Sequence, residues 1–470
     1  MSAGSRSTAL VATVLVALLV GALATLVPTP AAAQDEAPVV PATPVLSARR
    51  LPAVLQGTVA DPRLAEVVDP YLDGAPGETC AVVLDRGRVA YARNPDAAMV
   101  PASLLKLLNG VAALEVLGPD TRLPTVAGTT ASFVDGVVEG DLFVVGGGDP
   151  LLTTPGYQRS LEDPDQMVHQ FGELATALAG AGVREVRGDV VGDDSRYETV
   201  RWVPTWPTRY QREGFVGPLS ALMVNDGVTG FTETPDEENP RRQPGDPPAL
   251  AAQTLVALLE REGVRVTGTG AEGTAPDGLE ELARIESPPV SDLVTEMILD
   301  SDNTTAELLA REMGLRAEGA GTTAAGTQVI AETLASLGYD TEGLALNDGS
   351  GLDPANRVPC DLVLDILQRN GPDSLIGRAL AVAGTTGTLR DRMQGSEATG
   401  VVHAKTGTLN EVNALAGFAD TPPGSSITFV LVQNGLQPNG LSWVDRYADL
   451  LMGFADGPPL DALGPLPPTS

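Results

Sequence analysis

Two lysines and a few hydroxyl and amide side chains give this chain the groups needed for acyl transfer. Only two of its 30 lysine and arginine residues are lysines, Lys106 and Lys405. Arginine keeps its charge, whereas a buried lysine can lose its proton and act as a base, or present a compact positive charge to an anion. Ser103 precedes Lys106 by three residues, and Ser301 and Asn303 lie between the two lysines. This pattern predicts a serine nucleophile activated by a neutral amine.

We expect Ser103 and Lys106 to lie side by side, because residues three apart on a helix share a face. The neutral form of Lys106 would arise from burial and from the second cation, Lys405, since both lower the pKa of a lysine. A place in the first turn of a helix would direct backbone N–H groups toward negative charge developing at Ser103. The N–H groups of Ser103 and Thr408 are the predicted oxyanion hole.

The remaining predicted site residues bind the substrate or transfer a proton to its leaving group. Ser301 is predicted to relay a proton toward the leaving amine, and Asn303 to hold a substrate amide. One strand-edge segment is predicted to bind a substrate carboxylate and to complete the oxyanion hole; its members are Lys405, Thr406, Gly407 and Thr408. The ordinary alternative is that Ser103 and Asn303 cap helices, but capping requires neither lysine.

The three groups form an ordered set of motifs. Ser-x-x-Lys ends at Lys106, Ser-Asp-Asn occupies residues 301–303 and Lys-Thr-Gly begins at Lys405. Each motif alone is a weak signal, but their conjunction in this order is typical of penicillin-binding proteins and class A β-lactamases.

The sequence lacks the residues that other common catalytic mechanisms require. The chain has two histidines, His169 and His403, and no Gly-x-Ser-x-Gly sequence for a Ser-His-Asp hydrolase. We expect His403 to face away from Lys405 on a strand. The sequence also lacks Cys-x-x-Cys and EF-hand spacing, so neither a metal nor another cofactor is expected.

Over about residues 60 to 456, the chain resembles the D-alanyl-D-alanine carboxypeptidases of the penicillin-binding protein 4 type, peptidase family S13. Besides the three motifs, the resemblance rests on four segments, which are residues 140–150, 219–225, 348–352 and 387–389. It implies an α+β fold in which a penicillin-binding domain, an antiparallel sheet flanked by helices, is split by a smaller strand-rich domain. The 198 positions between Ser103 and Ser301 would hold this insertion. Residues 353–357 depart from the Ser-Arg usual in the family at this place.

The resemblance implies hydrolysis of the terminal D-Ala-D-Ala bond of peptidoglycan stem peptides through an acyl-enzyme on Ser103, with endopeptidase action on cross-links as a second activity. It also implies that β-lactams acylate the same serine. The alternatives are a serine β-lactamase and a non-catalytic cell-wall-binding protein on the same scaffold.

The predicted organisation begins with an export signal. An apolar run of 19 residues from Ala9 to Val27 precedes Ala31-Ala32-Ala33, which predicts a signal peptide cleaved after Ala33. An uncleaved membrane anchor is the alternative, and either reading places the chain outside the cytoplasm. The predicted parts are a signal peptide (1–33), a linker (34–48), the penicillin-binding domain (49–137 and 245–456), the inserted domain (138–244) and a disordered tail (457–470).

The formal net charge of −31 argues against nucleic acid and anionic lipid as partners. Cys80 and Cys360 would meet oxidising conditions and could either pair or remain buried thiols. The hydrophobic pattern predicts a hairpin over 79–91 and helices over 61–72, 102–117, 291–299 and 304–313. It also predicts strands over 401–408, 414–419 and 427–433, and a closing helix that carries Trp443 and Tyr447.

Overall fold

The computed structural model describes residues 43, 46–161, 163, 166–229, 243–422, 424–435, 440–454 and 463–465. Residues 56–457 are grouped as one compact unit, and the described residues outside this range are not part of it. The predicted signal peptide lies outside the described residues, as do most of the predicted linker and tail. No helix in the described part of the chain combines the length and apolar composition needed to cross a bilayer.

An antiparallel sheet of six strands forms the centre of the fold, in the order β18-β19-β20-β21-β1-β2. The first strand of the chain, β1, pairs along its whole length with the last strand, β21. The predicted hairpin is confirmed, with Arg86 and Gly87 at its turn in the left-handed conformation. The strands are β1 (Glu78–Asp85), β2 (Arg88–Arg93), β18 (Ala381–Val382), β19 (Val402–Leu409), β20 (Val412–Asp420) and β21 (Ser426–Asn434).

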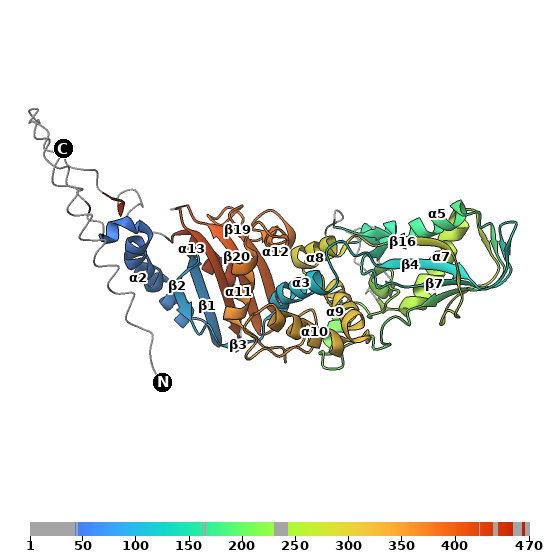
Figure 1. Cartoon of the computed structure of the whole chain (residues 1–470), viewed down its shortest axis with the longest axis horizontal. Coiled ribbons are helices and arrows are strands. Elements are labelled where there is room, and N and C mark those ends of the chain that lie inside the picture. The colour runs from blue at the N-terminus through green and yellow to red at the C-terminus, as the bar shows by residue number, and fades with distance from the viewer. Residues whose placement is uncertain are drawn as a thin grey trace, which may run out of the picture. The chain divides into compact units, whose positions relative to one another are not determined.

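Helices cover both faces of this sheet (Figure 1). Alternate residues of a strand face opposite sides, so Ala414 and Ala416 of β20 join one core while Leu415 joins the other. The first core contains α3 (Leu105–Val116), α8 (Val290–Leu299), α9 (Asn303–Glu318) and α11 (Cys360–Asn370), and the second contains α2 (Pro52–Asp73) and α13 (Gly440–Met452). The expected α+β class, with helices flanking an antiparallel sheet, is confirmed.

A disulfide ties the first core together. Cys80 of β1 and Cys360 at the start of α11 are bonded, with their Cα atoms 6.5 Å apart and both residues fully buried. Of the two alternatives that the sequence left open, the structure therefore has the paired form.

A second layered region lies between the first two motifs. Its two sheets have the orders β15-β11-β7-β4-β16 and β14-β10-β6-β5, and α5 and α7 pack on them around a separate apolar core. The elements are β4 (Pro124–Thr129), β5 (Phe133–Val134), β6 (Val137–Val138), β7 (Leu142–Val145), α5 (Gly172–Gly180), β10 (Glu185–Val186), β11 (Val190–Asp193), α7 (Pro247–Arg261), β14 (Arg265–Val266), β15 (Gly270–Glu272) and β16 (Glu280–Glu286).

These sheets extend beyond the predicted insertion of 138–244 at both ends. β4 precedes that range, and β16, which follows it, pairs with β4. Pro247 and Pro248, just beyond the predicted boundary at residue 244, occupy the first turn of α7, where proline is well tolerated.

Shorter elements complete the described chain. They are η1 (Ala48–Arg50), β3 (Ala98–Met99), η2 (Ala102–Leu104), β8 (Leu152–Thr153), α4 (Pro155–Gln158), β9 (His169–Gln170), α6 (Arg209–Glu213), η3 (Asn225–Gly227), β12 (Val228–Thr229), β13 (Gln243–Pro244), α10 (Thr323–Ser336), β17 (Val358–Pro359), α12 (Leu375–Arg378) and η4 (Gly387–Leu389).

Candidate active site

Ser103 lies in the short 3-10 turn η2, which leads directly into α3. The preceding residue, Ala102, has φ +48°, a left-handed conformation that is strained for a residue with a Cβ. Two glycines let other segments approach this turn. A Cβ on Gly351 would overlap the Ala102 carbonyl oxygen, and one on Gly407 would lie 2.9 Å from the Pro101 oxygen. The turn therefore brings Ser103 against both β19 and the loop around residue 350.

Lys106 bonds to three groups from three parts of the chain. Its Nζ lies 3.0 Å from Ser103 Oγ, 2.7 Å from Asn303 Oδ1 and 2.7 Å from the Ser350 carbonyl oxygen. Asn303 Oδ1 and the Ser350 carbonyl oxygen can only accept hydrogen bonds. A neutral amine has two N–H groups and one lone pair, so these two acceptors leave the lone pair facing the Ser103 hydroxyl. The arrangement suits proton transfer from Ser103 to Lys106.

The electrostatic surroundings favour loss of the Lys106 proton. Burial lowers the pKa of this lysine to about 8, against the opposing influence of the carboxylates of Asp302 and Asp348. About a tenth of the molecules would carry the neutral amine at pH 7. The sequence argument gave Lys405 a part in this shift, but burial is the main cause in the structure. For Lys405 itself, burial and then the charge of Lys106 hold the pKa well below its usual value.

The loop between α8 and α9 carries the second motif. Asp302 caps α9 by accepting a hydrogen bond from the Thr305 N–H, and this cap brings the next residue, Asn303, to Lys106. Asn303 Nδ2 also donates to the Phe215 carbonyl oxygen at 2.6 Å. Ser301 adopts φ +61°. Within the described residues it makes no hydrogen bond to Ser103 or Lys106, so the predicted proton relay through Ser301 stays a prediction, as does the amide-holding role of Asn303.

The third motif lies on β19. Lys405 is fully buried and its Nζ donates to the Thr406 carbonyl oxygen at 3.1 Å. The Thr406 hydroxyl donates to that of Thr388 in η4 at 2.9 Å. Strand β18 pairs with β19 only at Ala404 and His403. β19 is therefore not paired with β18 beyond residue 404. Thr408, the predicted oxyanion-hole residue, lies on this stretch of β19.

The expected orientation of His403 is wrong. His403 and Lys405 are two positions apart on β19, and residues two apart on a strand share a face. His403 is exposed, whereas Lys405 is buried. No hydrogen bond joins His403 to Ser103 among the described residues.

Several groups around Lys106 were not assigned from the sequence. The Ser350 carbonyl, the Phe215 carbonyl and Thr388 all contact predicted site residues. Two of them belong to segments 348–352 and 387–389, which carried the family resemblance but received no role. The two main-chain carbonyls leave no signal in residue types, so only the fold could reveal them. Thr388 makes its contact through its side-chain hydroxyl.

Buried carboxyl groups surround the site. Burial raises the pKa of Glu307 to about 8 and that of Asp300 to about 6. Burial likewise raises the pKa of Glu296, which accepts hydrogen bonds from Gln166 and Thr305. These groups are therefore less charged than exposed carboxylates, and they oppose the loss of the Lys106 proton less strongly.

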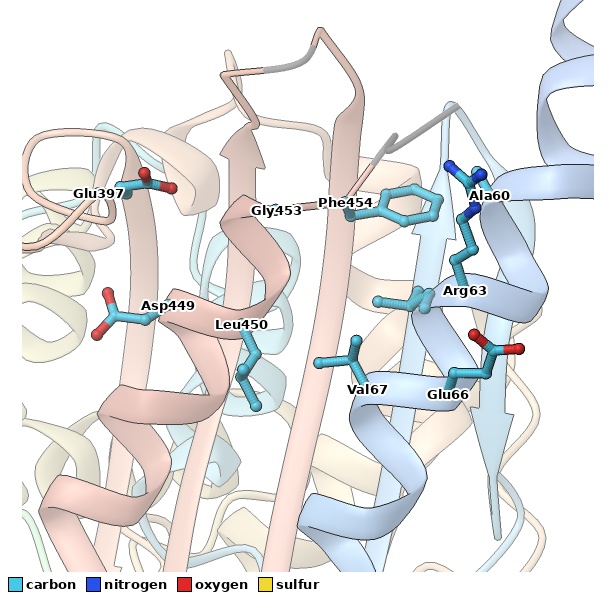
Figure 2. A pocket seen from close by; sticks show the side chains of 10 residues that line it. Ala60, Arg63, Glu66, Val67, Glu397, Asp449, Leu450, Gly453 and Phe454 are labelled. Atoms are coloured by element: carbon cyan, nitrogen blue, oxygen red, sulfur yellow. The ribbon is translucent and has the colours of Figure 1, made fainter. Parts of the chain in front are cut away.

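Two hollows differ in whether they adjoin the predicted site. One, with a volume of about 200 Å³, is lined by Asp302, Thr304, Tyr157, Trp202 and Phe215, among others. It therefore lies next to Asn303. A larger cleft between α2 and α13 is lined by Arg63, Glu66, Glu397 and Asp449, among others (Figure 2). No predicted site residue lines this second cleft.

Comparisons with known proteins identify relatives that cover most of the chain. The model of the D-Ala-D-Ala carboxypeptidase 3 (S13) family matches residues 63–245 and 240–448. The chain is 33% identical over 462 residues to a D-alanyl-D-alanine carboxypeptidase of Actinomadura sp., covering 82% of this chain and 83% of that protein. It is 30% identical over 444 residues to carboxypeptidase DacB of Mycolicibacterium smegmatis, covering 92% of this chain and 90% of that one.

Among solved structures, penicillin-binding protein 4 of Haemophilus influenzae has the same fold. The TM-score is 0.68 at 21% identity, with 84% of this chain and 98% of that chain covered. The same protein in complex with a β-lactam gives a TM-score of 0.65, also at 21% identity, with 82% of this chain and 98% of that chain covered.

Proposed function

Because this chain belongs to the D-Ala-D-Ala carboxypeptidase 3 (S13) family, we propose that it is a serine carboxypeptidase that acts through an acyl-enzyme on Ser103. Its substrates are peptidoglycan stem peptides that end in D-Ala-D-Ala, and it releases the terminal D-alanine. Endopeptidase action on cross-links would use the same chemistry. The observation that carries the proposal is the hydrogen bond between Lys106 Nζ and Ser103 Oγ, with the other Lys106 bonds going to carbonyl oxygens.

In acylation, Ser103 Oγ attacks the carbonyl carbon of the penultimate D-alanine while Lys106 takes the hydroxyl proton. The negative charge that develops on the carbonyl oxygen is held by the N–H groups of Ser103 and Thr408. The C–N bond then breaks, and the proton reaches the leaving amine with Ser301 as relay. Water hydrolyses the resulting ester and restores the Ser103 hydroxyl.

The substrate is held by the remaining residues of the proposal. Lys405, Thr406 and Thr408 bind the terminal carboxylate, and Gly407 lets the strand edge approach Ser103. Asn303 holds an amide of the stem peptide, which requires that its Nδ2 exchange the Phe215 carbonyl for the substrate. A β-lactam presents a reactive amide and a carboxylate in a similar arrangement, so it acylates Ser103 as well.

The cell envelope is the proposed site of action, since peptidoglycan lies outside the cytoplasm. The N-terminal segment would act as a cleaved signal, and an uncleaved anchor is the alternative. N-terminal sequencing of the native protein distinguishes them: a chain that begins at Gln34 supports cleavage, and an intact start in the membrane fraction supports the anchor.

The test of function uses the purified chain and a stem pentapeptide, with products identified by mass. Loss of one D-alanine supports the carboxypeptidase. A chain that hydrolyses penicillin rapidly and leaves the pentapeptide intact is instead a β-lactamase. A chain that does neither is a non-catalytic protein on this scaffold.

A further inference from the structure

One short stretch of backbone beside Lys106 is held entirely by buried side chains. The N–H and C=O groups of Gly349 and Ser350 all form hydrogen bonds with these side chains. Glu307 Oε1 accepts from the N–H groups of Gly349 at 2.9 Å and Ser350 at 2.8 Å. Asn109 Nδ2 donates to the Gly349 oxygen at 2.9 Å, and Lys106 Nζ donates to the Ser350 oxygen at 2.7 Å. Glu307, Asn109 and Lys106 are all fully buried.

The three side chains come from two helices that the core fixes in place. Lys106 and Asn109 are three residues apart on α3 and share a face, and Glu307 lies in the second turn of α9. Asn109 also donates to the Ala306 oxygen at 2.8 Å, which joins α3 to α9 directly beside Glu307. A Cβ on Gly349 would lie 2.8 Å from that same oxygen, so the loop packs too closely for another residue.

We propose that Glu307 is a positioning residue for acylation, because it holds the Gly349–Ser350 backbone so that the Ser350 carbonyl fixes Lys106 Nζ in front of Ser103. This inference rests on the proposed function. Lys106 can rotate about four side-chain bonds, and the direction of its lone pair depends on where its two N–H groups are bound. If the Ser350 carbonyl shifts, the lone pair no longer faces the hydroxyl. Misplacement of about 1 Å can reduce a rate by about 10²-fold.

Glu307 does this work as a neutral acid. Its Oε2 atom is buried and, among the described residues, has no hydrogen-bond partner, as is also true of Asn109 Oδ1. An ionised carboxylate with an unbonded buried oxygen is strongly disfavoured. Burial raises the pKa of Glu307 to about 8, which agrees with a protonated group at pH 7. A neutral amide should therefore replace this side chain with little loss.

The experiment compares Glu307→Gln with Glu307→Met. Glutamine keeps an oxygen that accepts both backbone N–H groups, whereas methionine has a similar length and no such acceptor. Acylation by a fluorescent penicillin is followed over a range of concentrations, which separates the limiting acylation rate from the dissociation constant of the initial complex. We expect Glu307→Met to lower the limiting rate by about 10- to 100-fold with the dissociation constant within about threefold of the parent. Glu307→Gln should stay within about threefold in both.

The matched control is Glu312→Met on the same helix. Glu312 is also buried, and it bonds to Arg196 and Tyr197, away from Ser350. Its loss should lower the melting temperature and leave the acylation rate within about threefold of the parent. If this control loses as much acylation as Glu307→Met, general loosening of α9 explains the effect and the proposal is overturned.

Other outcomes are equally decisive. A Glu307→Met variant that acylates at the parent rate overturns the proposal while leaving the serine mechanism intact. If Glu307→Met does not fold, Glu307→Gln decides: retained acylation supports the neutral-acceptor role, and a loss of tenfold or more contradicts it. A parent chain that takes no label at Ser103 overturns the proposed function and this inference together.

Discussion

Replacing each lysine in turn by arginine tests whether Lys106 acts as the base and Lys405 binds the substrate carboxylate. Both substitutions place an arginine, which stays charged, at a fully buried position. Lys106 has a pKa of about 8, so about a tenth of the parent molecules carry the neutral amine at pH 7. An arginine with a pKa above about 12 leaves roughly 10⁻⁵ in the neutral form. The base therefore disappears in Lys106→Arg although the charge remains.

The expected fall for Lys106→Arg is about 10²–10⁴-fold in acylation rate, the usual contribution of general-base catalysis. Lys405→Arg should retain a measurable fraction, at least tenfold above that of Lys106→Arg, because carboxylate binding needs only a cationic donor within reach. The assay is the rate of fluorescent penicillin attachment at pH 7 for each variant. Melting curves come first, since a guanidinium is bulkier than an ammonium group. If folded Lys106→Arg acylates as fast as the parent, Lys106 is not the base and the reasoning is refuted.

Three further predictions concern pH, the disulfide and backbone packing. The acylation rate should rise about tenfold per pH unit below pH 8 and level off above it, because a lysine base works only when deprotonated; a rate that stays constant from pH 6 to 9 contradicts this. Cys80→Ser should lower the free energy of unfolding by about 2–4 kcal/mol in denaturant titrations, and an unchanged midpoint would show that the bond contributes little. Gly351→Ala should lower acylation at least about tenfold, because its Cβ would displace the turn that carries Ser103 and misplaced reacting groups lose rate. Gly319→Ala, also at positive φ but in open space, should affect stability only, and equal loss in both variants would contradict the packing argument.

The pairing of Ser103 with Lys106 could be predicted because the two residues are close together in the sequence. Ser103 and Lys106 are three residues apart, and helical geometry alone puts their side chains together. The meeting of Asn303 with Lys106 spans 197 positions, and only the order of the motifs suggested it. The hairpin and the later strands followed from short apolar runs joined by short turns.

Features that depend on backbone groups or distant pairing were not predictable. The Ser350 carbonyl bonds to Lys106 through its main chain, which any residue type could provide. The pairing of β4 with β16 joins strands more than 150 residues apart, and no local pattern in the sequence indicates such a pairing. The position of His403 was a different kind of error, since the two-residue period of a strand already places it on the face of Lys405.

The central claim is that Ser103 is the nucleophile. The most direct measurement is mass mapping of the peptide that carries the label after incubation with a fluorescent penicillin. We predict a single acyl group on Ser103, and no label on a folded Ser103→Ala variant. Label on another residue, or equal labelling of Ser103→Ala, would contradict the account.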